Sequence, residues 1–331
     1  MNVTMKDVAE KANVSLSTVS RVINNSNLVS KETTLRVRKA IEELDYQINE
    51  SARALRTNIS KLIGVIGAGM DNPFLMKVLK SIETEAIKKN YNIIYGDSEG
   101  ELEQELYYIN MFKQKKIDGL VIMTAKFADD LIEAVKKSNI PTVFASGHLK
   151  KASLPSVTVN NIKAAENVSE YLFGLGKYFG IIRGPYLDSV ASEERMQGVT
   201  NKYHEKDVEL KSRYIVEGDF TYKSGYHAAK ILINKNNDLS SIFAFNDQMA
   251  IGAIKYCIDN NIKVPENISI IGFDDIELAK YANPSLSTVC QSGTNLGIEI
   301  MRILLKEMKG NKVKQNKVFI PHKLIIRESS K

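Results

Sequence analysis

Long hydrophobic runs are missing from this chain of 331 residues. No stretch of about 18 consecutive apolar residues occurs, so we expect no membrane-spanning helix. The first residues, MNVTMKDVAEK, lack the apolar segment of a secretory signal, and we therefore expect a cytoplasmic protein. The two cysteines, Cys257 and Cys290, lie apart and have no metal-ligating neighbours, which is typical of buried thiols in a reducing compartment.

Catalytic and metal-binding patterns are missing as well. The four histidines have no partner at metal-ligand or catalytic-triad spacing, and no G-x-S-x-G nucleophile elbow occurs. Gly67 and Gly69 begin a pattern like that of a dinucleotide-binding loop, but Asn72 occupies the place of the third glycine and Pro73 follows it. We therefore expect no enzymatic activity, no cofactor and no metal. We expect Asp71, Asn72 and Pro73 to cap a helix that faces the cleft and the partner subunit.

Residues 4–24, TMKDVAEKANVSLSTVSRVIN, are the most informative part of what is present. Their apolar residues recur at helical spacing, which predicts two short helices joined by a tight turn. Asn13 marks the end of the first helix, and Ser15 is placed as the N-cap of the second. The apolar positions that we expect on the inner faces are Val8, Ala9, Ala12, Val19, Val22 and Ile23.

The outer face of the second helix indicates a nucleic-acid contact. It carries small or hydrogen-bonding groups around one cation, Arg21. Such a helix suits the DNA major groove, where an arginine can donate two hydrogen bonds to guanine. The formal net charge of +6 is a mild excess that would not by itself predict DNA binding. The DNA contacts that we expect from this segment are Thr4, Met5, Ser15, Leu16, Ser17, Thr18, Ser20, Arg21 and Asn24.

The same segment resembles the LacI/GalR family of transcription regulators. It matches the family motif T-x-x-D-V-A-x-x-A-x-V-S-x-x-T-V-S-R-V-[IV]-N throughout. An ordinary helical hairpin on a protein surface is the alternative interpretation. The resemblance implies an all-α three-helix DNA-binding head, which contains a helix-turn-helix and is followed by a hinge helix. It also implies an α/β body of the periplasmic-binding-protein type I with two lobes.

A third helix is predicted over residues 30–45, and it completes a head that we place at residues 1–48. Ser30 is its expected N-cap. Its expected apolar face consists of Leu35, Val37, Ile41 and Leu44.

Residues 49–60 are too short to form a stable helix by themselves in water. In the family that the chain resembles, this segment is a hinge helix that becomes ordered on operator DNA and inserts a leucine into the minor groove. Leu55 occupies that position of the motif. We therefore expect further DNA contacts from Asn49, Ala52 and Leu55, and a plain linker is the alternative.

Residues 61–331 alternate between short apolar strands and helical stretches, in two successive sets. This alternation predicts parallel sheets covered by helices, in two lobes with a ligand cleft at the carboxyl ends of the strands. The resemblance implies that the chain crosses between the lobes near residues 160–162, 289–292 and 319–321. The end of the chain lacks a leucine heptad, so we expect a homodimer rather than a tetramer.

Polar residues at the predicted strand ends are the candidate effector contacts. The resemblance implies that such residues bond the hydroxyls of a sugar or sugar phosphate while an aromatic ring stacks on it, and this chemistry suits a polyol. Asn246 and Asp247 could instead cap the helix that follows them. His148 also lies at this end of the lobe, where a lone histidine is more often simply exposed. The expected effector contacts are Asn72, Ser146, Arg195, Phe220, Asn246 and Asp274.

The C-terminal part resembles one branch of the family, the catabolite-control regulators of low-GC Gram-positive bacteria. These regulators bind serine-phosphorylated HPr, and their motif Q-P-M-Y-D-I-G-A-x-x-M-R-L-L-x-K corresponds to QSGTNLGIEIMRILLK here. Arg302 and Lys306 match the motif one helical turn apart, so they could clamp a phosphate together. A solvated pair of cations is the alternative. Thr294 and Asn295 depart from the Tyr-Asp pair of the motif.

Together these patterns predict a homodimeric, cytoplasmic regulator of carbon metabolism that binds double-stranded DNA at a pseudo-palindromic operator. The resemblance implies that serine-phosphorylated HPr, a sugar phosphate, or both modulate it. The alternative is a local repressor of a sugar operon, which a free carbohydrate inducer releases from its operator. A sugar-binding transport protein would share the body but would lack the head.

Overall fold

The computed structural model describes residues 3–23, 27–46, 59–124, 128–145, 154–185, 190–311 and 317–331. The chain divides into two compact units, Met1–Ser60 and Lys61–Lys331, which we call the head and the body. Some of the expected contact residues lie outside the described residues, namely Asn24, Asn49, Ala52, Leu55 and Ser146.

The described residues of the head form three helices, namely α1 (Met5–Lys11), α2 (Leu16–Ile23) and α3 (Lys31–Glu43). Asn13 adopts a left-handed conformation, with φ of 51°, and turns the chain between α1 and α2. The Ser15 hydroxyl accepts a hydrogen bond from the Thr18 amide at 3.2 Å, which confirms the predicted N-cap of α2. Ser30 likewise accepts from the Thr33 amide at 3.2 Å. The buried core of the head is Val8, Ala9, Ala12, Val19, Val22, Val37 and Ala40.

One core prediction for α3 is wrong. Leu35 is 68% exposed, whereas Val37 and Ala40 are buried and Ile41 and Leu44 pack partly against them. The four contacting positions are spaced three and four residues apart, so they form one stripe along the helix. Leu35 precedes Val37 by only two residues, which places it about 200° away on the helix surface.

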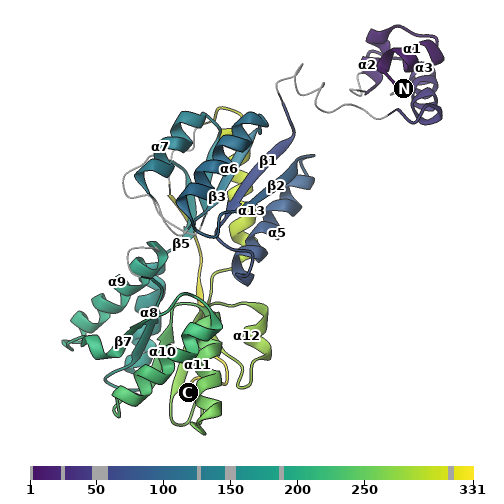
Figure 1. The fold of residues 1–331 in the computed structure, drawn as a ribbon. Coiled ribbons are helices and arrows are strands. Elements are labelled where there is room, and N and C mark those ends of the chain that lie inside the picture. Colours follow the sequence, from purple (N-terminus) through teal and green to yellow (C-terminus); the bar gives the residue numbers. More distant parts are fainter. Residues whose placement is uncertain are drawn as a thin grey trace. The chain divides into compact units, whose positions relative to one another are not determined.

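The first lobe of the body contains a six-stranded parallel sheet in the order β11-β5-β4-β3-β1-β2 (Figure 1). Its strands are β1 (Leu62–Gly67), β2 (Asn92–Asp97), β3 (Gly119–Met123), β4 (Thr142–Ala145), β5 (Ser156–Val159) and β11 (Lys317–Ile320). Its helices are α5 (Pro73–Ile87), α6 (Leu102–Gln114), α7 (Asp129–Ser138) and α13 (Gly293–Glu307). Helices α6 and α7 pack together on one face of the sheet, and α5 and α13 pack together on the other.

The second lobe contains a sheet in the order β12-β10-β9-β8-β6-β7, in which β12 alone is antiparallel to its neighbour. Its strands are β6 (Gly180–Arg183), β7 (Ile215–Glu217), β8 (Ser241–Ala244), β9 (Ser269–Asp274), β10 (Ser287–Cys290) and β12 (Lys323–Ile325). Its helices are α8 (Asn161–Phe173), α9 (Val190–Glu205), η1 (Ser212–Tyr214), α10 (Tyr222–Lys235), α11 (Asp247–Asp259) and α12 (Glu277–Tyr281).

The central strands are apolar on both faces because helices cover both sides of each sheet. Every residue of β3 and of β9 is buried, which explains why these strands are continuous apolar runs rather than alternating patterns. None of the described helices is long and apolar enough to cross a membrane.

The chain passes between the lobes three times, as predicted. The passages lie between β5 and α8, between β10 and α13, and between β11 and β12. Since β5 and β11 are neighbours in register, with Ile320 opposite Val159, the first and third crossings leave the sheet side by side. The carboxyl ends of both sheets therefore face the same cleft.

Candidate DNA-binding face and effector cleft

The outer surface of α2 is the candidate DNA-binding face of the head. Leu16 is 52% exposed although it is apolar, and Ser17 and Arg21 are also exposed. The Ser15 hydroxyl lies 2.8 Å from that of Ser17 and 2.9 Å from that of Thr18, so hydroxyl groups cluster at the start of the helix. A helix N-terminus with hydroxyls and one cation can approach both base edges and phosphates.

Two other expected DNA contacts, Thr4 and Met5, make contacts within the head. The Thr4 backbone amide and hydroxyl both donate to Asp7, at 2.7 and 2.8 Å, which forms a capping box with the return bond from the Asp7 amide. These bonds lower the pKa of the Asp7 carboxyl. Met5 packs partly against the core of the head. Ser20 is half-buried on the side of α2.

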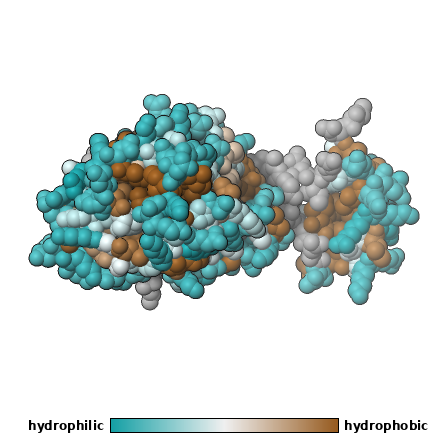
Figure 2. Space-filling model, turned by 90° about the horizontal axis from the view of Figure 1, so that it is seen from below, coloured by the Kyte–Doolittle hydropathy of each residue, from teal (hydrophilic) through white to brown (hydrophobic). Residues whose placement is uncertain are grey.

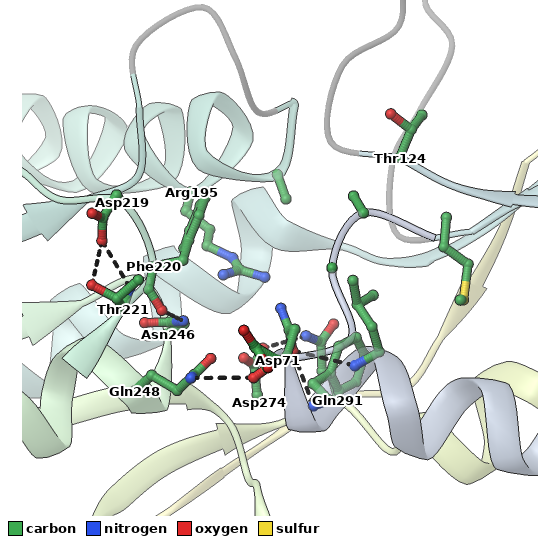
Figure 3. Close-up of a pocket in the computed structure, with 17 residues that line it drawn as sticks. Asp71, Thr124, Arg195, Asp219, Phe220, Thr221, Asn246, Gln248, Asp274 and Gln291 are labelled. Carbon is green, nitrogen blue, oxygen red and sulfur yellow. Dashed lines mark hydrogen bonds between the residues drawn. The ribbon is translucent and has the colours of Figure 1, made fainter. Parts of the chain in front are cut away.

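A cavity of about 260 Å³ lies between the lobes of the body (Figure 3). It brings together five of the expected effector contacts, because the strand ends of both sheets meet there. The residues that line it are Ala68, Gly69, Asp71, Asn72, Phe74, Leu75, Met123, Thr124, Ala191, Arg195, Asp219, Phe220, Thr221, Asn246, Gln248, Asp274 and Gln291.

The first lobe contributes mainly the loop after β1 and the start of α5. The Asn72 side chain accepts from the amides of Phe74 and Leu75 at 3.0 and 3.2 Å, which confirms that Asn72 and Pro73 begin a helix. Asp97 accepts from the amide of Gly69 at 2.9 Å, so its carboxylate holds the loop in place. This acid therefore has a structural role, in contrast to the ribose-binding acid of a dinucleotide site.

Arg195 of α9 is the cation of the cleft. It is 5% exposed, and its guanidinium points into the pocket (Figure 3). Its Nε donates to Asn161 Oδ1 at 3.0 Å, and its Nη1 donates to the Phe245 carbonyl. The guanidinium lies 3.5 Å from the centroid of the Phe273 ring. Burial lowers the pKa of Arg195 to about 10, while Asp274 acts in the opposite direction.

Asp274 ends β9 opposite this cation. It is 8% exposed, and it adopts the unusual φ of 122°. Gln291 Nε2 donates to its Oδ1 at 2.5 Å. Burial raises the pKa of Asp274 to about 7, although Arg195 and Gln291 both favour the charged form.

Asn246 caps the helix that follows it, which was the alternative to its interpretation as an effector contact. Its Oδ1 accepts from the Met249 amide at 2.9 Å at the start of α11, and its Nδ2 donates to the Phe220 carbonyl at 2.9 Å. Asn246 also lines the cavity, so contact with an effector stays a prediction. Its capping bond stabilises α11, and its second bond holds the loop that carries Phe220.

Asp247 neither lines the cavity nor acts as a cap. Its two oxygens accept from the Ile276 amide at 2.8 Å and from the Thr288 hydroxyl at 2.5 Å. Burial and the nearby Asp274 raise the pKa of this carboxyl well above its usual value. The interpretation of Asp247 as a helix cap is therefore wrong, because its side chain connects α11 to β10 and to the start of α12.

Several lining residues were not among the expected contacts. Gln291 lies at the second lobe crossing, and Asp219 and Thr221 flank Phe220 in the sequence, so position alone could have indicated all three. Gln248 donates to the Asp71 carbonyl at 3.4 Å and so connects the two lobes across the cleft. That contact depends on the folded body and has no signal in the sequence.

The candidate phosphate clamp lies on the exposed side of α13. Arg302 and Lys306 are both exposed there. Glu299 occupies the guanidinium of Arg302, which donates through Nε at 2.7 Å and through Nη2. This bidentate contact raises the pKa of Arg302. A phosphate group would therefore have to displace Glu299 from Arg302, or bind Arg302 together with Glu299.

Comparison with known proteins identifies the family. Residues 4–49 match the model of bacterial regulatory proteins of the lacI family, and residues 60–328 match the model of periplasmic binding proteins and sugar-binding domains of the LacI family. The chain belongs to the LacI family of DNA-binding transcriptional regulators. The predicted family and fold class are therefore confirmed.

Relatives of this LacI-family chain match it from end to end. It is 33% identical to catabolite control protein A of Priestia megaterium, over 100% of both chains. It is also 33% identical to the transcriptional repressor CytR of Escherichia coli, over 99% of this chain and 96% of the relative. The lac repressor dimer bound to operator and the anti-inducer ONPF superposes with a TM-score of 0.91 at 26% identity, over 100% of this chain and 99% of the other.

The raised pKa of Asp274 predicts a pH dependence of stability. Its folded-state pKa of about 7 exceeds the value of an exposed aspartate, so its contribution weakens as the pH rises from about 4 to 7. Relative to the wild type, Asp274→Asn should gain stability over that range, by at most about 1.4 kcal/mol per pH unit. Thermal unfolding of both proteins between pH 4.5 and 8 measures this. Asp129→Asn, at an exposed position, is the control, and a pH-independent difference for Asp274→Asn would contradict the assignment.

Proposed function

We propose that this regulator binds a pseudo-palindromic operator as a homodimer and responds to an uncharged polyhydroxylated effector in the cleft. The exposed outer face of α2 is the observation that carries the DNA-binding part. Family membership and the likeness to an operator-bound repressor support it. A homodimer is supported by exposed apolar side chains of the body, such as Leu278 and Tyr281 of α12. Figure 2 shows apolar areas of this kind within a mostly hydrophilic surface.

Arg21 tests the base readout by the head. Arg21→Ala should lose about 1–3 kcal/mol of affinity for an operator selected by the wild type from random duplex DNA. Its affinity for random DNA should change much less, because a guanine contact depends on sequence. Fluorescence anisotropy at fixed salt measures both affinities. Arg36→Ala, an exposed cation of α3, is the matched control and should weaken both complexes equally if it acts at all. If Arg21→Ala lost the same affinity for operator and for random DNA, Arg21 would contact phosphates only.

The charges of the cleft support an uncharged effector. Among the lining residues in the described part of the chain, Arg195 is the one cation, whereas Asp71, Asp219 and Asp274 carry carboxyl groups. Arg195 already bonds Asn161 and a backbone carbonyl. A phosphate ester brings nearly two further negative charges, which these carboxyl groups would repel. The aromatic ring of Phe220 supplies an apolar wall for the face of a sugar.

Calorimetry with matched ligand pairs tests the effector class. D-glucose, D-ribose and D-fructose should be compared with their phosphate esters, and an uncharged sugar should bind at least tenfold more tightly than its own ester. Asp219→Asn should reduce that preference because it removes one repelling carboxylate from the cavity wall. A phosphate ester that binds more tightly than its parent sugar would refute the proposal and favour the sugar-phosphate interpretation.

A catabolite-control function is the second candidate. The match to catabolite control protein A extends over the whole chain, and Arg302 and Lys306 lie exposed on one helix. Glu299 already engages Arg302, however, and Thr294 and Asn295 replace the aromatic and acidic residues of the motif. Loss of an aromatic anchor commonly costs about 2 kcal/mol, which corresponds to roughly thirtyfold in affinity. We therefore expect weak binding of serine-phosphorylated HPr.

A titration of serine-phosphorylated HPr distinguishes the two candidates. If α13 holds the phosphate, Arg302→Ala should abolish the weak binding, and Glu299→Gln should strengthen it by releasing the guanidinium. Unphosphorylated HPr is the control. Tight binding that survives Arg302→Ala would exclude the clamp, and absence of binding to every variant would favour control by a small molecule alone.

A further inference from the structure

The cation of the cleft is held by a residue that directly follows a lobe crossing. Asn161 is the first residue of α8, immediately after the first crossing, and it is 1% exposed. Its Oδ1 accepts from Arg195 Nε at 3.0 Å, and its Nδ2 donates to Glu194 Oε2 at 3.0 Å. These two partners fix the orientation of the amide. In a flipped amide, the NH₂ group would face the Nε–H of Arg195, and the oxygen would face the carboxylate of Glu194. Asn161 therefore bridges two adjacent, oppositely charged residues of α9.

Glu194 extends this bridge to the other lobe. Its second oxygen, Oε1, lies 3.6 Å from Lys317 Nζ. Lys317 begins β11, an edge strand of the first-lobe sheet, whereas Glu194 belongs to α9 of the second lobe. The side chains of Lys317 and Glu194 are 24% and 10% exposed, so water screens this pair less than a surface pair. The ion pair therefore joins the two lobes at the start of β11.

The same series of contacts continues to the second crossing. Arg195 packs on the ring of Phe273, the neighbour of Asp274 in β9, and Gln291 at the second crossing donates to Asp274. Polar contacts therefore run from Lys317 to Arg195, and the ring of Phe273 and the backbone of β9 link Arg195 to Asp274 and Gln291. They involve residues at the first and second crossings and at the start of β11, the strand that leads to the third crossing.

We propose that Lys317, Glu194 and Asn161 are positioning residues that couple the arrangement of the lobes to the placement of Arg195 in the cleft. A movement of β11 against α9 changes the Lys317–Glu194 distance, and the shared Asn161 amide passes that change to the guanidinium. A ligand that binds Arg195 better in one arrangement thereby favours that arrangement of the lobes. The proposal depends on the proposed function only for the identity of that ligand.

Another ion pair of α9 provides the contrast. Lys202 pairs with Glu170 of α8 at 3.1 Å, on the same helix as Glu194 but within one lobe. Glu170 also pairs with Lys206 at 2.7 Å, so Glu170→Gln removes charge contacts near the end of this helix without affecting a connection between lobes. Glu170→Gln is therefore a matched control for variants of the pair between the lobes.

The Nε–Hε resonance of Arg195 reports on the coupling directly. In full-length protein labelled with ¹⁵N-arginine, this resonance is identified by its loss in Arg195→Lys. Lys317→Met should shift it, although Lys317 does not contact Arg195, and the shift should reach at least half of that caused by Glu194→Gln. The double variant should shift it no further than Glu194→Gln alone, and Glu170→Gln should leave it in place.

A shift in Glu194→Gln without one in Lys317→Met would overturn the proposal, because Glu194 would then act only within its own lobe. Circular dichroism of each variant establishes that the fold is retained. The measurement needs neither DNA nor an effector, so its failure is separable from failure of the proposed function.

Discussion

Burial of one positive charge governs the organisation of the cleft. Arg195 is almost fully removed from water, and a guanidinium in that position costs several kcal/mol unless polar partners replace its hydration. The second lobe supplies those partners from separate elements, namely the Asn161 amide, the Phe245 carbonyl and the Asp274 carboxylate. The cleft therefore keeps its shape only while α8, α9 and the strands β8 and β9 stay in register. Stability of the lobe and geometry of the site rest on the same contacts.

Parallel topology explains why residues distant in the sequence meet in this cleft. The strands of each lobe end at one edge of a sheet, and the three crossings bring the two edges together. The topology also explains the double use of Asn246. A residue after a strand begins the next helix, so its side chain is needed as a cap at the position where it faces the cleft.

Local patterns predicted the helices of the head, both serine caps and the alternating body, because capping and apolar spacing act over a few residues. The burial of Leu35 was predicted wrongly, because an apolar residue type alone does not show whether the side chain faces the core or the solvent. The predicted strand ends and the resemblance to the family together led to five of the residues that line the cleft. The pairing of Gln291 with Asp274 and that of Glu194 with Lys317 could not be predicted, because tertiary packing alone creates them. The pairing of Glu299 with Arg302 did have a signal in the sequence, because the two opposite charges lie three residues apart on one helix.

The hydrogen-bonding groups of the cleft are already engaged to a large extent by the protein. Asn246 uses both ends of its amide, and Arg195 uses Nε and Nη1. Each of these groups keeps further capacity, since an amide oxygen has two lone pairs and a guanidinium has five N–H donors. A ligand with several hydroxyls can both donate and accept, and it can complete such half-used groups without breaking the bonds that hold the lobe. A ligand that needed the whole guanidinium would have to break the contacts of Arg195 with Asn161 and with the Phe245 carbonyl, and the burial of this cation would then depend on the ligand and on Asp274.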